Sequence, residues 1–218
     1  MLRFAPSPNG WLHLGHAYSA LFAFETAKRI GGRFLLRIED IDKGRCRPEY
    51  EEAIYEDLAW LGLEWEEPVR RQSEHFADYE RGLKHLRGMG LVYPCFATRK
   101  EIQDAIVASG IPLQNWPTDP DGAPLYPGIC KDMPKERLNE LMWEGRTYAW
   151  RLDTEKAKHE AERINGGPIT VNEEGESARG DHGRLASEPE LFGDVVIARK
   201  DVPTSYHLAV TMDDALQG

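Results

Sequence analysis

The fold of this chain is decided by one stretch near its start, Arg3-Phe4-Ala5-Pro6-Ser7-Pro8-Asn9-Gly10-Trp11-Leu12-His13-Leu14-Gly15-His16. The stretch begins with a short apolar strand that carries an arginine. A turn follows, because proline fixes φ and an Asn-Gly pair tolerates positive φ. A helix then begins within the His-Leu-Gly-His segment. This order of strand, turn and helix predicts the first half of a β-α-β unit.

Two histidines lie three residues apart at the start of the predicted helix. His13 and His16 therefore share one face of its first turn. The N-terminal end of a helix offers free N–H groups and partial positive charge, so a phosphate can bind there. Gly15 has no side chain, and a flat ligand could approach the backbone at this point. Taken alone, a His-x-x-His pattern also fits a helix start with two incidental histidines.

The residues that follow complete the unit. Apolar residues at helical spacing predict a helix over 13–30, which ends at Gly31-Gly32, and an apolar strand follows over 33–38. Ligands of such sheets lie at the carboxyl ends of the strands. This rule brings Ser7 and the two histidines to one crevice with three carboxylates, those of Glu39, Asp40 and Asp42. These carboxylates either act on a ligand or form a solvated turn.

The rest of the chain predicts further helices and strands with two irregular segments. We expect helices over 48–61, 74–89, 98–109 and 134–143, strands over 2–4, 91–96, 146–154 and 193–200, a further element at 206–210, and loops over 112–128 and 173–190. A capping box, Thr98 with Glu101, marks the start of the third of these helices. The chain has no Gly-x-Gly-x-x-Gly and no P-loop lysine motif, which disfavours a dehydrogenase and a P-loop kinase.

The composition is that of a globular protein. The chain has 218 residues, of which 41% are hydrophobic and 29% charged. No apolar run approaches the roughly 20 residues that span a bilayer, so we expect no membrane association. Three cysteines form no even disulfide framework, which favours the reducing cytoplasm. The net charge of −10 argues against broad, charge-driven nucleic-acid binding but leaves room for a local basic face.

Two long motifs in this order resemble those of one enzyme family. The first stretch is similar to the "HIGH" signature of class I aminoacyl-tRNA synthetases in the form used by the glutamyl branch. Residues 35–42, Leu-Leu-Arg-Ile-Glu-Asp-Ile-Asp, resemble that branch's Leu-Arg-Ile-Glu-Asp-x-Asp. Within the branch, residues 13–21 look most like the glutamyl-queuosine tRNA(Asp) synthetases, short paralogues without an anticodon-binding domain. The resemblance covers essentially the whole chain.

The resemblance implies both a fold and an activity. The expected fold is α/β, with a Rossmann-type nucleotide-binding catalytic domain over 1–90 and 191–218. An α+β domain over 91–190 is inserted into it and is expected to resemble the family's acceptor-binding domain. The expected activity is ATP-dependent activation of L-glutamate to glutamyl-adenylate, followed by transfer to queuosine in the anticodon of tRNA(Asp). We expect a cytoplasmic monomer whose partners are L-glutamate, ATP and tRNA(Asp).

The resemblance also assigns roles to individual residues. His13 and His16 would act in catalysis by contacting the ATP phosphates, and Gly15 would make room for adenine. Mg²⁺ should accompany ATP, held mostly by phosphates and water. The glutamate-binding residues would be Arg3, Phe4, Ala5, Pro6, Ser7, Glu39 and Tyr206. Arg3 is the natural partner of a carboxylate, because its guanidinium can bind both oxygens.

The chain departs from the family pattern at a zinc motif. The family often carries Cys-x-Cys followed by Tyr-x-x-x-Cys. This chain keeps Cys95, Tyr126 and Cys130 but has Ala97 at the second cysteine position. Since a structural zinc site uses four donors, we assign no metal ligands and expect little zinc. Cys95 and Cys130 can equally be small buried apolar groups.

A second departure concerns the end of the sequence. Family members continue with another arginine of the amino-acid pocket and a Lys-Met-Ser-Lys-Ser loop, and neither lies within residues 1–218. We therefore expect the complete protein to extend further. Two alternatives stay open at this point. The chain could be the catalytic part of an ordinary glutamyl-tRNA synthetase, or a catalytically dead module that binds nucleotides or RNA.

Overall fold

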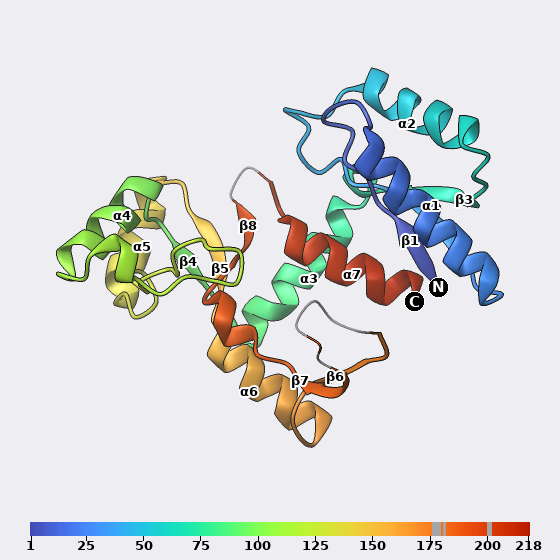
Figure 1. The fold of residues 1–218 in the computed structure, drawn as a ribbon. Coiled ribbons are helices and arrows are strands. Elements are labelled where there is room, and N and C mark those ends of the chain that lie inside the picture. Colours follow the sequence, from blue (N-terminus) through green and yellow to red (C-terminus); the bar gives the residue numbers. More distant parts are fainter. Residues whose placement is uncertain (176–179, 181, 200–201) are drawn as a thin grey trace. The chain divides into compact units, whose positions relative to one another are not determined.

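The structure, a computed structural model, describes residues 1–175, 180, 182–199 and 202–218. The chain divides into two compact units, one formed by residues 1–82 and 202–218 and the other by residues 83–201 (Figure 1).

The first unit is built on a parallel three-stranded sheet. Its strands are β1 (Leu2–Phe4), β2 (Phe34–Ile38) and β3 (Glu66–Arg71), in the order β1-β2-β3. They are connected by helices α1 (Leu14–Arg29) and α2 (Pro48–Trp60). Arg3 pairs with Leu35, and Arg37 pairs with Arg70. The predicted β-α-β opening is confirmed, and a second helix and strand extend it.

A hydrophobic core lies between this sheet and its helices. Strand β2 is buried along its whole length, which explains its nearly continuous apolar sequence. Helix α1 faces the core with three alanines, whose small side chains allow close packing against the strands. The buried members of the core are Phe4, Ala20, Ala23, Ala27, Phe34, Leu36, Ile38, Ile54, Leu58 and Leu63.

Strand β3 was not predicted from the sequence. Its residues, Glu-Glu-Pro-Val-Arg-Arg, show no alternation of apolar and polar side chains, and its first half is exposed. It lies at the edge of the sheet. Proline has no backbone N–H group to donate, and an edge strand tolerates this on its outer side because it pairs with no further strand there. Position in the sheet, rather than local propensity, makes this segment a strand.

The C-terminal element of the first unit is a helix. The element expected at 206–210 is α7 (Tyr206–Gln217), which buries Leu208, Ala209 and Asp213. It packs closely on α3 (Phe76–Gly88). The absence of a side chain at Gly82 allows this approach, since a Cβ atom there would overlap the Met212 sulfur. The 3₁₀ turn η1 (Gln72–Glu74) links β3 to α3.

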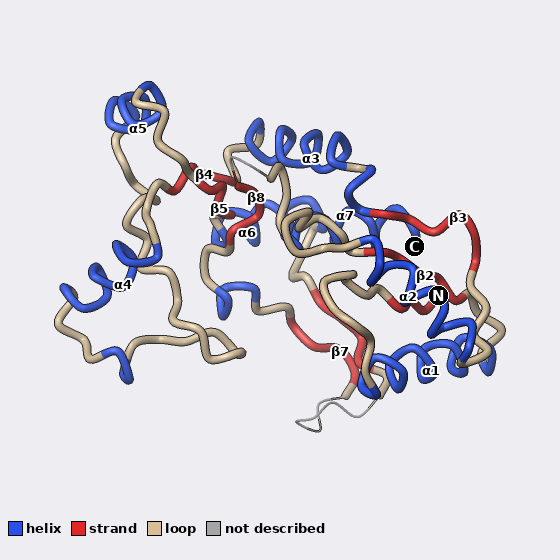
Figure 2. The backbone as a smooth tube through the Cα atoms, turned by 90° about the horizontal axis from the view of Figure 1, so that it is seen from above, coloured by secondary structure: helices blue, strands red, loops and turns tan. Residues whose placement is uncertain are grey.

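The second unit contains an antiparallel sheet of β4 (Val92–Cys95), β5 (Ala149–Leu152) and β8 (Val196–Arg199), in the order β4-β5-β8. Helices α4 (Arg99–Ala108), α5 (Lys135–Trp143) and α6 (Thr154–Asn165) accompany it. The predicted capping box of Thr98 and Glu101 is present at the start of α4. The proline-rich segment over 112–128 is mostly loop, apart from the turn η2 (Leu113–Asn115) (Figure 2).

One helix of the second unit was missed, and one predicted loop was wrong. Helix α6 was not predicted because its sequence, Thr-Glu-Lys-Ala-Lys-His-Glu-Ala-Glu-Arg-Ile-Asn, is strongly polar. The segment 173–190, expected to be a loop, contains β7 (Gly183–Ala186) and the start of η3 (Pro189–Phe192). Strand β7 pairs with β6 (Thr170–Glu173). Residues 176–179 and 181 of the predicted loop, and residue 200 of the last predicted strand, lie outside the described residues.

Candidate functional site

The candidate site lies at the carboxyl ends of β1 and β2. The turn after β1 and the loop after β2 are joined by backbone hydrogen bonds. Glu39 N donates to Pro6 O at 3.0 Å, and Arg47 N donates to Pro8 O at 3.0 Å. Phe4, Pro6 and Pro8 are buried, whereas Ala5 and Ser7 are partly exposed beside them. The segment Phe4–Ser7 is thus fixed against the residues that follow β2, as the strand-end rule predicts.

The two histidines form a reciprocal cap at the start of α1. His13 is the N-cap residue, and its Nδ1 accepts a hydrogen bond from Gly15 N at 3.1 Å. His16 Nδ1 accepts from His13 N at 3.2 Å, and the ring centroids lie 3.9 Å apart. A ring nitrogen that accepts a hydrogen bond carries no proton, so each neutral ring has its proton on Nε2. Both Nε2–H groups therefore remain available to donate to an anion.

The electrostatics of this pair favour the neutral form of His16. Burial, and secondarily the neighbouring His13, lower the pKa of His16 below its ordinary value. The pair thus offers oriented hydrogen-bond donors at a helix N-terminus, where the backbone contributes further positive potential. This arrangement suits a phosphate group.

Gly15 has a structural role in addition to the predicted one. A Cβ atom at this position would lie 3.0 Å from His13 Cε1 and 3.2 Å from His13 Nδ1. The absence of a side chain therefore leaves space for the capping ring of His13. The role in accommodating adenine stays a prediction.

Four charged side chains form a continuous series across the unit. Arg3 Nη1 and Arg37 Nη1 each donate to Asp214 Oδ1, both at 2.6 Å. Arg37 Nη2 donates to Glu39 Oε1 at 2.8 Å. The series alternates in sign, from Arg3 on β1 to Asp214 on α7, then Arg37 on β2 and Glu39 just after it. The side chain of Arg37 is only 3% exposed, that of Glu39 11% and that of Arg3 16%.

Burial perturbs the titration of this series. It raises the pKa of Glu39, and the hydrogen bond from Arg37 only partly offsets that effect. Burial and the neighbouring Arg37 lower the pKa of Arg3. The Nε atoms of both arginines are buried and have no hydrogen-bond partner among the described residues. A cation and a carboxylate are thus partly desolvated at the two ends of this series.

The residue before Asp214 fixes α7 in place. Asp213 is fully buried and accepts three hydrogen bonds: from Arg70 Nε at 2.7 Å, from Gln72 Nε2 at 2.9 Å and from Tyr79 Oη at 2.9 Å. Burial and the bond to Asp213 raise the pKa of Tyr79. Through these contacts α7 is anchored to β3, η1 and α3.

The other predicted site residues lie apart from this series. Asp40 accepts hydrogen bonds from Ser73 N at 2.8 Å and from Ser73 Oγ at 2.6 Å, and so fixes the turn η1 that follows β3. Asp42 closes a local turn with Arg45, at 2.7 Å. Tyr206 is the first residue of α7 and is exposed, with its ring 5.8 Å from that of His207. Its proposed contact with glutamate stays a prediction.

Three residues of the predicted zinc motif converge in the second unit. Cys95 Sγ lies 3.3 Å from Tyr126 Oη, and Cys130 N donates to the same oxygen at 2.8 Å. A hydrogen bond from the Cys130 thiol lowers the pKa of Cys95 below its ordinary value. The described residues contain no group of three or more His, Cys, Asp or Glu side chains that could hold a metal. Two thiols and a phenol fall short of the four donors of a structural zinc site.

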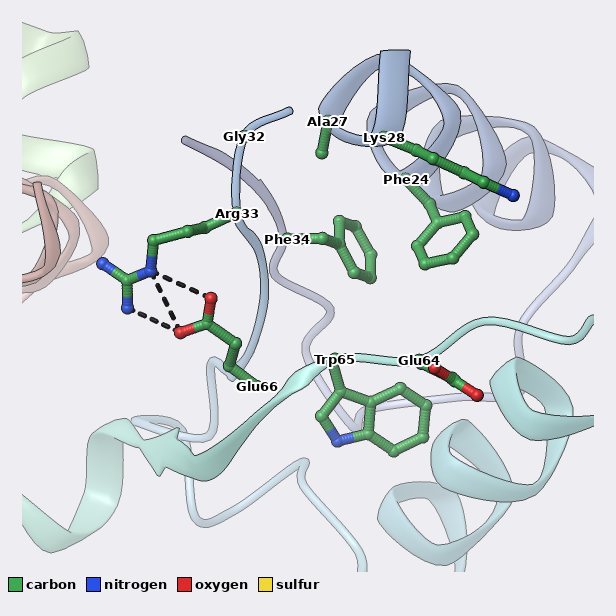
Figure 3. A pocket seen from close by; sticks show the side chains of 9 residues that line it. All are labelled: Phe24, Ala27, Lys28, Gly32, Arg33, Phe34, Glu64, Trp65 and Glu66. Carbon is green, nitrogen blue, oxygen red and sulfur yellow. Dashed lines mark hydrogen bonds and ion pairs between the residues drawn. The ribbon is translucent and has the colours of Figure 1, made fainter. Parts of the chain in front are cut away.

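A pocket of about 330 Å³ lies at the opposite, amino ends of the strands. The side chains of Phe24, Phe34 and Trp65 line it, and Arg33 is paired with Glu66 at its side through Nη2 at 2.6 Å (Figure 3). It therefore does not belong to the site at the carboxyl ends.

No helix in the described part of the chain is both long enough and apolar enough to cross a membrane.

The first unit is a parallel β-α-β-α-β arrangement whose first helix starts with groups that can bind phosphate. Charged side chains lie in and directly after its strands. This is the arrangement of a Rossmann-type nucleotide-binding domain. The chain belongs to the family described as tRNA synthetases class I (E and Q), catalytic domain, which matches residues 1–218. The resemblance inferred from the two motifs is thereby confirmed. The chain carries the catalytic domain of a ligase of the aminoacyl-tRNA synthetase type, a class that uses ATP.

Relatives within the family carry two names. The chain is 43% identical to the glutamyl-Q tRNA(Asp) synthetase of Rhodobacter capsulatus, over 99% of this chain and 73% of that protein. It is 39% identical to the protein of the same name from Nocardia farcinica, over 99% and 60%. The glutamate–tRNA ligase of Aquifex aeolicus is 36% identical, over 99% of this chain and 41% of that protein. The chain thus spans between two fifths and three quarters of these relatives.

A solved structure shares the fold. The glutamate tRNA ligase of Elizabethkingia meningosepticum, crystallised in complex with its amino acid, superimposes with a TM-score of 0.70 at 28% identity. The match covers 98% of this chain and 41% of that one. The predicted class I Rossmann-type α/β fold is confirmed.

Proposed function

We propose that the protein to which this chain belongs activates L-glutamate with ATP and transfers it to queuosine in the anticodon of tRNA(Asp). The observation that carries the proposal is the series of ion pairs Arg3–Asp214–Arg37–Glu39, in the same unit as the histidine cap of α1. An amino acid with a carboxylate side chain needs a cation for that carboxylate and an anion for its ammonium. Arg3 lies within β1 and Glu39 follows β2 directly, in the unit that also holds the helix start that suits phosphate.

The chemistry requires no covalent nucleophile from the protein. The α-carboxylate of glutamate attacks the α-phosphate of ATP, a mixed anhydride forms, and pyrophosphate leaves. Arg3 holds the side-chain carboxylate and Glu39 the ammonium, so that the attacking oxygen is positioned. The Nε2–H groups of His13 and His16 donate to phosphate oxygens as negative charge develops there. Phe4, Ala5, Pro6, Ser7 and Tyr206 complete the wall of the amino-acid pocket.

ATP brings Mg²⁺ to the site as part of the bound substrate. The described residues contain no cluster of acidic side chains and histidines that could cage this ion. Phosphates and water therefore supply most of its ligands. The ion neutralises phosphate charge when it is bound.

The nucleic-acid specificity is proposed from the relatives. Three proteins named glutamyl-Q tRNA(Asp) synthetase stand at 39–43% identity and a fourth at 35%, and the Aquifex glutamate–tRNA ligase stands at 36%. The segment over residues 13–21 favours the same assignment. We propose that the domain over 91–190 contacts the RNA. We also propose that the protein functions as a monomer in the cytoplasm.

The first experiment measures glutamate-dependent exchange of pyrophosphate into ATP by the full-length protein. Arg3→Ala and Glu39→Ala should each lower exchange by about one to two orders of magnitude, since a charge-assisted contact to a bound carboxylate or ammonium contributes about 1.5–3 kcal/mol. Glu160→Gln, which changes a local ion pair with Arg163 on α6 in the other unit, is the control and should retain exchange. A near wild-type KM for glutamate in both pocket variants would refute the assignment.

The second experiment identifies the RNA. The full-length protein should activate glutamate without any tRNA, and should then label tRNA(Asp) that carries queuosine. It should leave tRNA(Glu) unlabelled. Efficient charging of the 3′ end of tRNA(Glu) would instead identify an ordinary glutamate–tRNA ligase. Binding of ATP without exchange would identify a catalytically dead module.

A further inference from the structure

Asp214 occupies a special position among the charged residues of the site. A single oxygen, Oδ1, accepts hydrogen bonds from Arg3 and from Arg37, each at 2.6 Å. These two arginines come from neighbouring strands of the sheet, β1 and β2. The carboxylate itself comes from α7, 211 residues away from Arg3 in the sequence. Asp214 therefore joins the two strands that carry the proposed substrate contacts.

The two guanidinium groups need this carboxylate. Without it, two cations that are both largely buried would face each other with no shared counter-ion, a costly arrangement in a medium of low dielectric constant. Glu39 neutralises Arg37 from the other side, at 2.8 Å, but Asp214 is the only ion-pair partner of Arg3 among the described residues. The orientation of Arg3 thus depends on Asp214.

The series also fixes the distance between the side chains of Arg3 and Glu39. Arg3 and Glu39 are the two ends of the sequence of contacts Arg3–Asp214–Arg37–Glu39, and every link in it is 2.8 Å or shorter. Helix α7 cannot shift easily, because the buried Asp213 next to Asp214 is held by three donors. The separation between the cation and the carboxylate is therefore determined by rigid elements, as a site that measures the length of its substrate requires.

We propose that Asp214 is a positioning residue that sets the spacing between Arg3 and Glu39, and thereby selects L-glutamate over the shorter L-aspartate. The inference rests on the proposed function, since it assigns the two ends of the substrate to Arg3 and Glu39. Asp214 does not touch the substrate. It orients Arg3, so that the side-chain carboxylate is bound only when it lies at the correct distance from the ammonium.

The test compares amino-acid binding by Asp214 variants of the full-length protein, using isothermal titration with L-glutamate and L-aspartate in the absence of ATP, and measures the KM for ATP separately by pyrophosphate exchange. Asp214→Asn keeps an acceptor oxygen but removes the charge. It should weaken glutamate binding at least tenfold and reduce the preference for glutamate over aspartate at least fivefold. Asp214→Glu restores the carboxylate and should recover part of both quantities. The KM for ATP should change less than twofold in either variant.

Two controls separate positioning from folding. Glu66→Gln breaks an equally short ion pair, with Arg33, at the amino ends of the same sheet, and should leave both affinities unchanged. Thermal unfolding of each variant shows whether the unit remains folded. Because Asp214 is exposed at one edge, with 49% of its side chain accessible, we expect the Asn variant to fold.

The outcomes distinguish this inference from the proposed function. Unchanged or tighter glutamate binding by a folded Asp214→Asn variant would overturn the inference and leave the function standing. An equal loss of affinity for glutamate and aspartate would also overturn it, because a merely structural residue would act on both alike. If the wild-type protein binds no glutamate at all, the proposed function fails, and the inference fails with it.

Discussion

Replacing Asp213 by asparagine should destabilise the first unit strongly. The carboxylate is fully buried and accepts hydrogen bonds from Arg70, Gln72 and Tyr79. Asparagine has the same shape but no charge, and its amide nitrogen would face at least one of these donors. The guanidinium of Arg70, whose side chain is only 12% exposed, would lose its buried counter-ion. Breaking a buried pair by removing one partner costs about 3–5 kcal/mol.

The assay is thermal unfolding followed by circular dichroism. For a unit of this size, about 3 kcal/mol corresponds to a fall of the melting temperature of the first unit by more than about 10 °C. Glu66→Gln, on the same sheet but in an exposed pair, should leave the melting temperature nearly unchanged. A shift below about 3 °C for Asp213→Asn would refute the argument, because it would show that α7 is held in place by other contacts.

Three further predictions concern the site and the cysteines. Gly15→Ala should lower kcat for pyrophosphate exchange more than it raises the KM for ATP. The new Cβ atom would press on the His13 ring and disturb the cap. An effect on KM alone would show that the position of the ring does not matter in the transition state. Burial raises the pKa of the Glu39 side chain, so this carboxylate takes up a proton at a higher pH than a solvent-exposed glutamate side chain would. Binding of the substrate L-glutamate should therefore weaken as the pH falls. Titration calorimetry between pH 5 and 7.5 checks this, and Glu39→Gln should remove the dependence. Purified protein should contain little stoichiometric zinc by elemental analysis, because Cys95, Tyr126 and Cys130 provide too few donors; one tightly bound zinc per chain would contradict this.

The sequence predicted the elements whose signals are local. The helix start at His13 and the apolar strand after Gly32 follow from periodicity, turn residues and capping, which act over a few positions. The capping box at Thr98 was found for the same reason. These signals were sufficient to place the site at the carboxyl ends of the first two strands.

The missing parts depend on contacts between distant residues. Strand β3 is polar and forms because β2 offers it an edge, and α6 is so polar overall that the helical spacing of its few apolar residues gave little signal. The ion pair of Arg3 with Asp214 joins residues 211 positions apart, which no local pattern reveals. One signal was available: an arginine inside the apolar strand Phe34–Ile38 has to be paired when it is buried, and Arg37 therefore pointed to a missing carboxylate.

The alternation of charge at the site also bears on how ligands arrive there. Two guanidinium groups and two carboxylates cancel, so the cluster projects little net field beyond its own dimensions. The chain as a whole carries a charge of −10, and both ATP and glutamate are anions. Long-range electrostatics therefore oppose the encounter, and added salt, which shortens the Debye length to about 8 Å at physiological strength, should speed association rather than slow it. Attraction at this site acts only at contact distance, after water has been displaced.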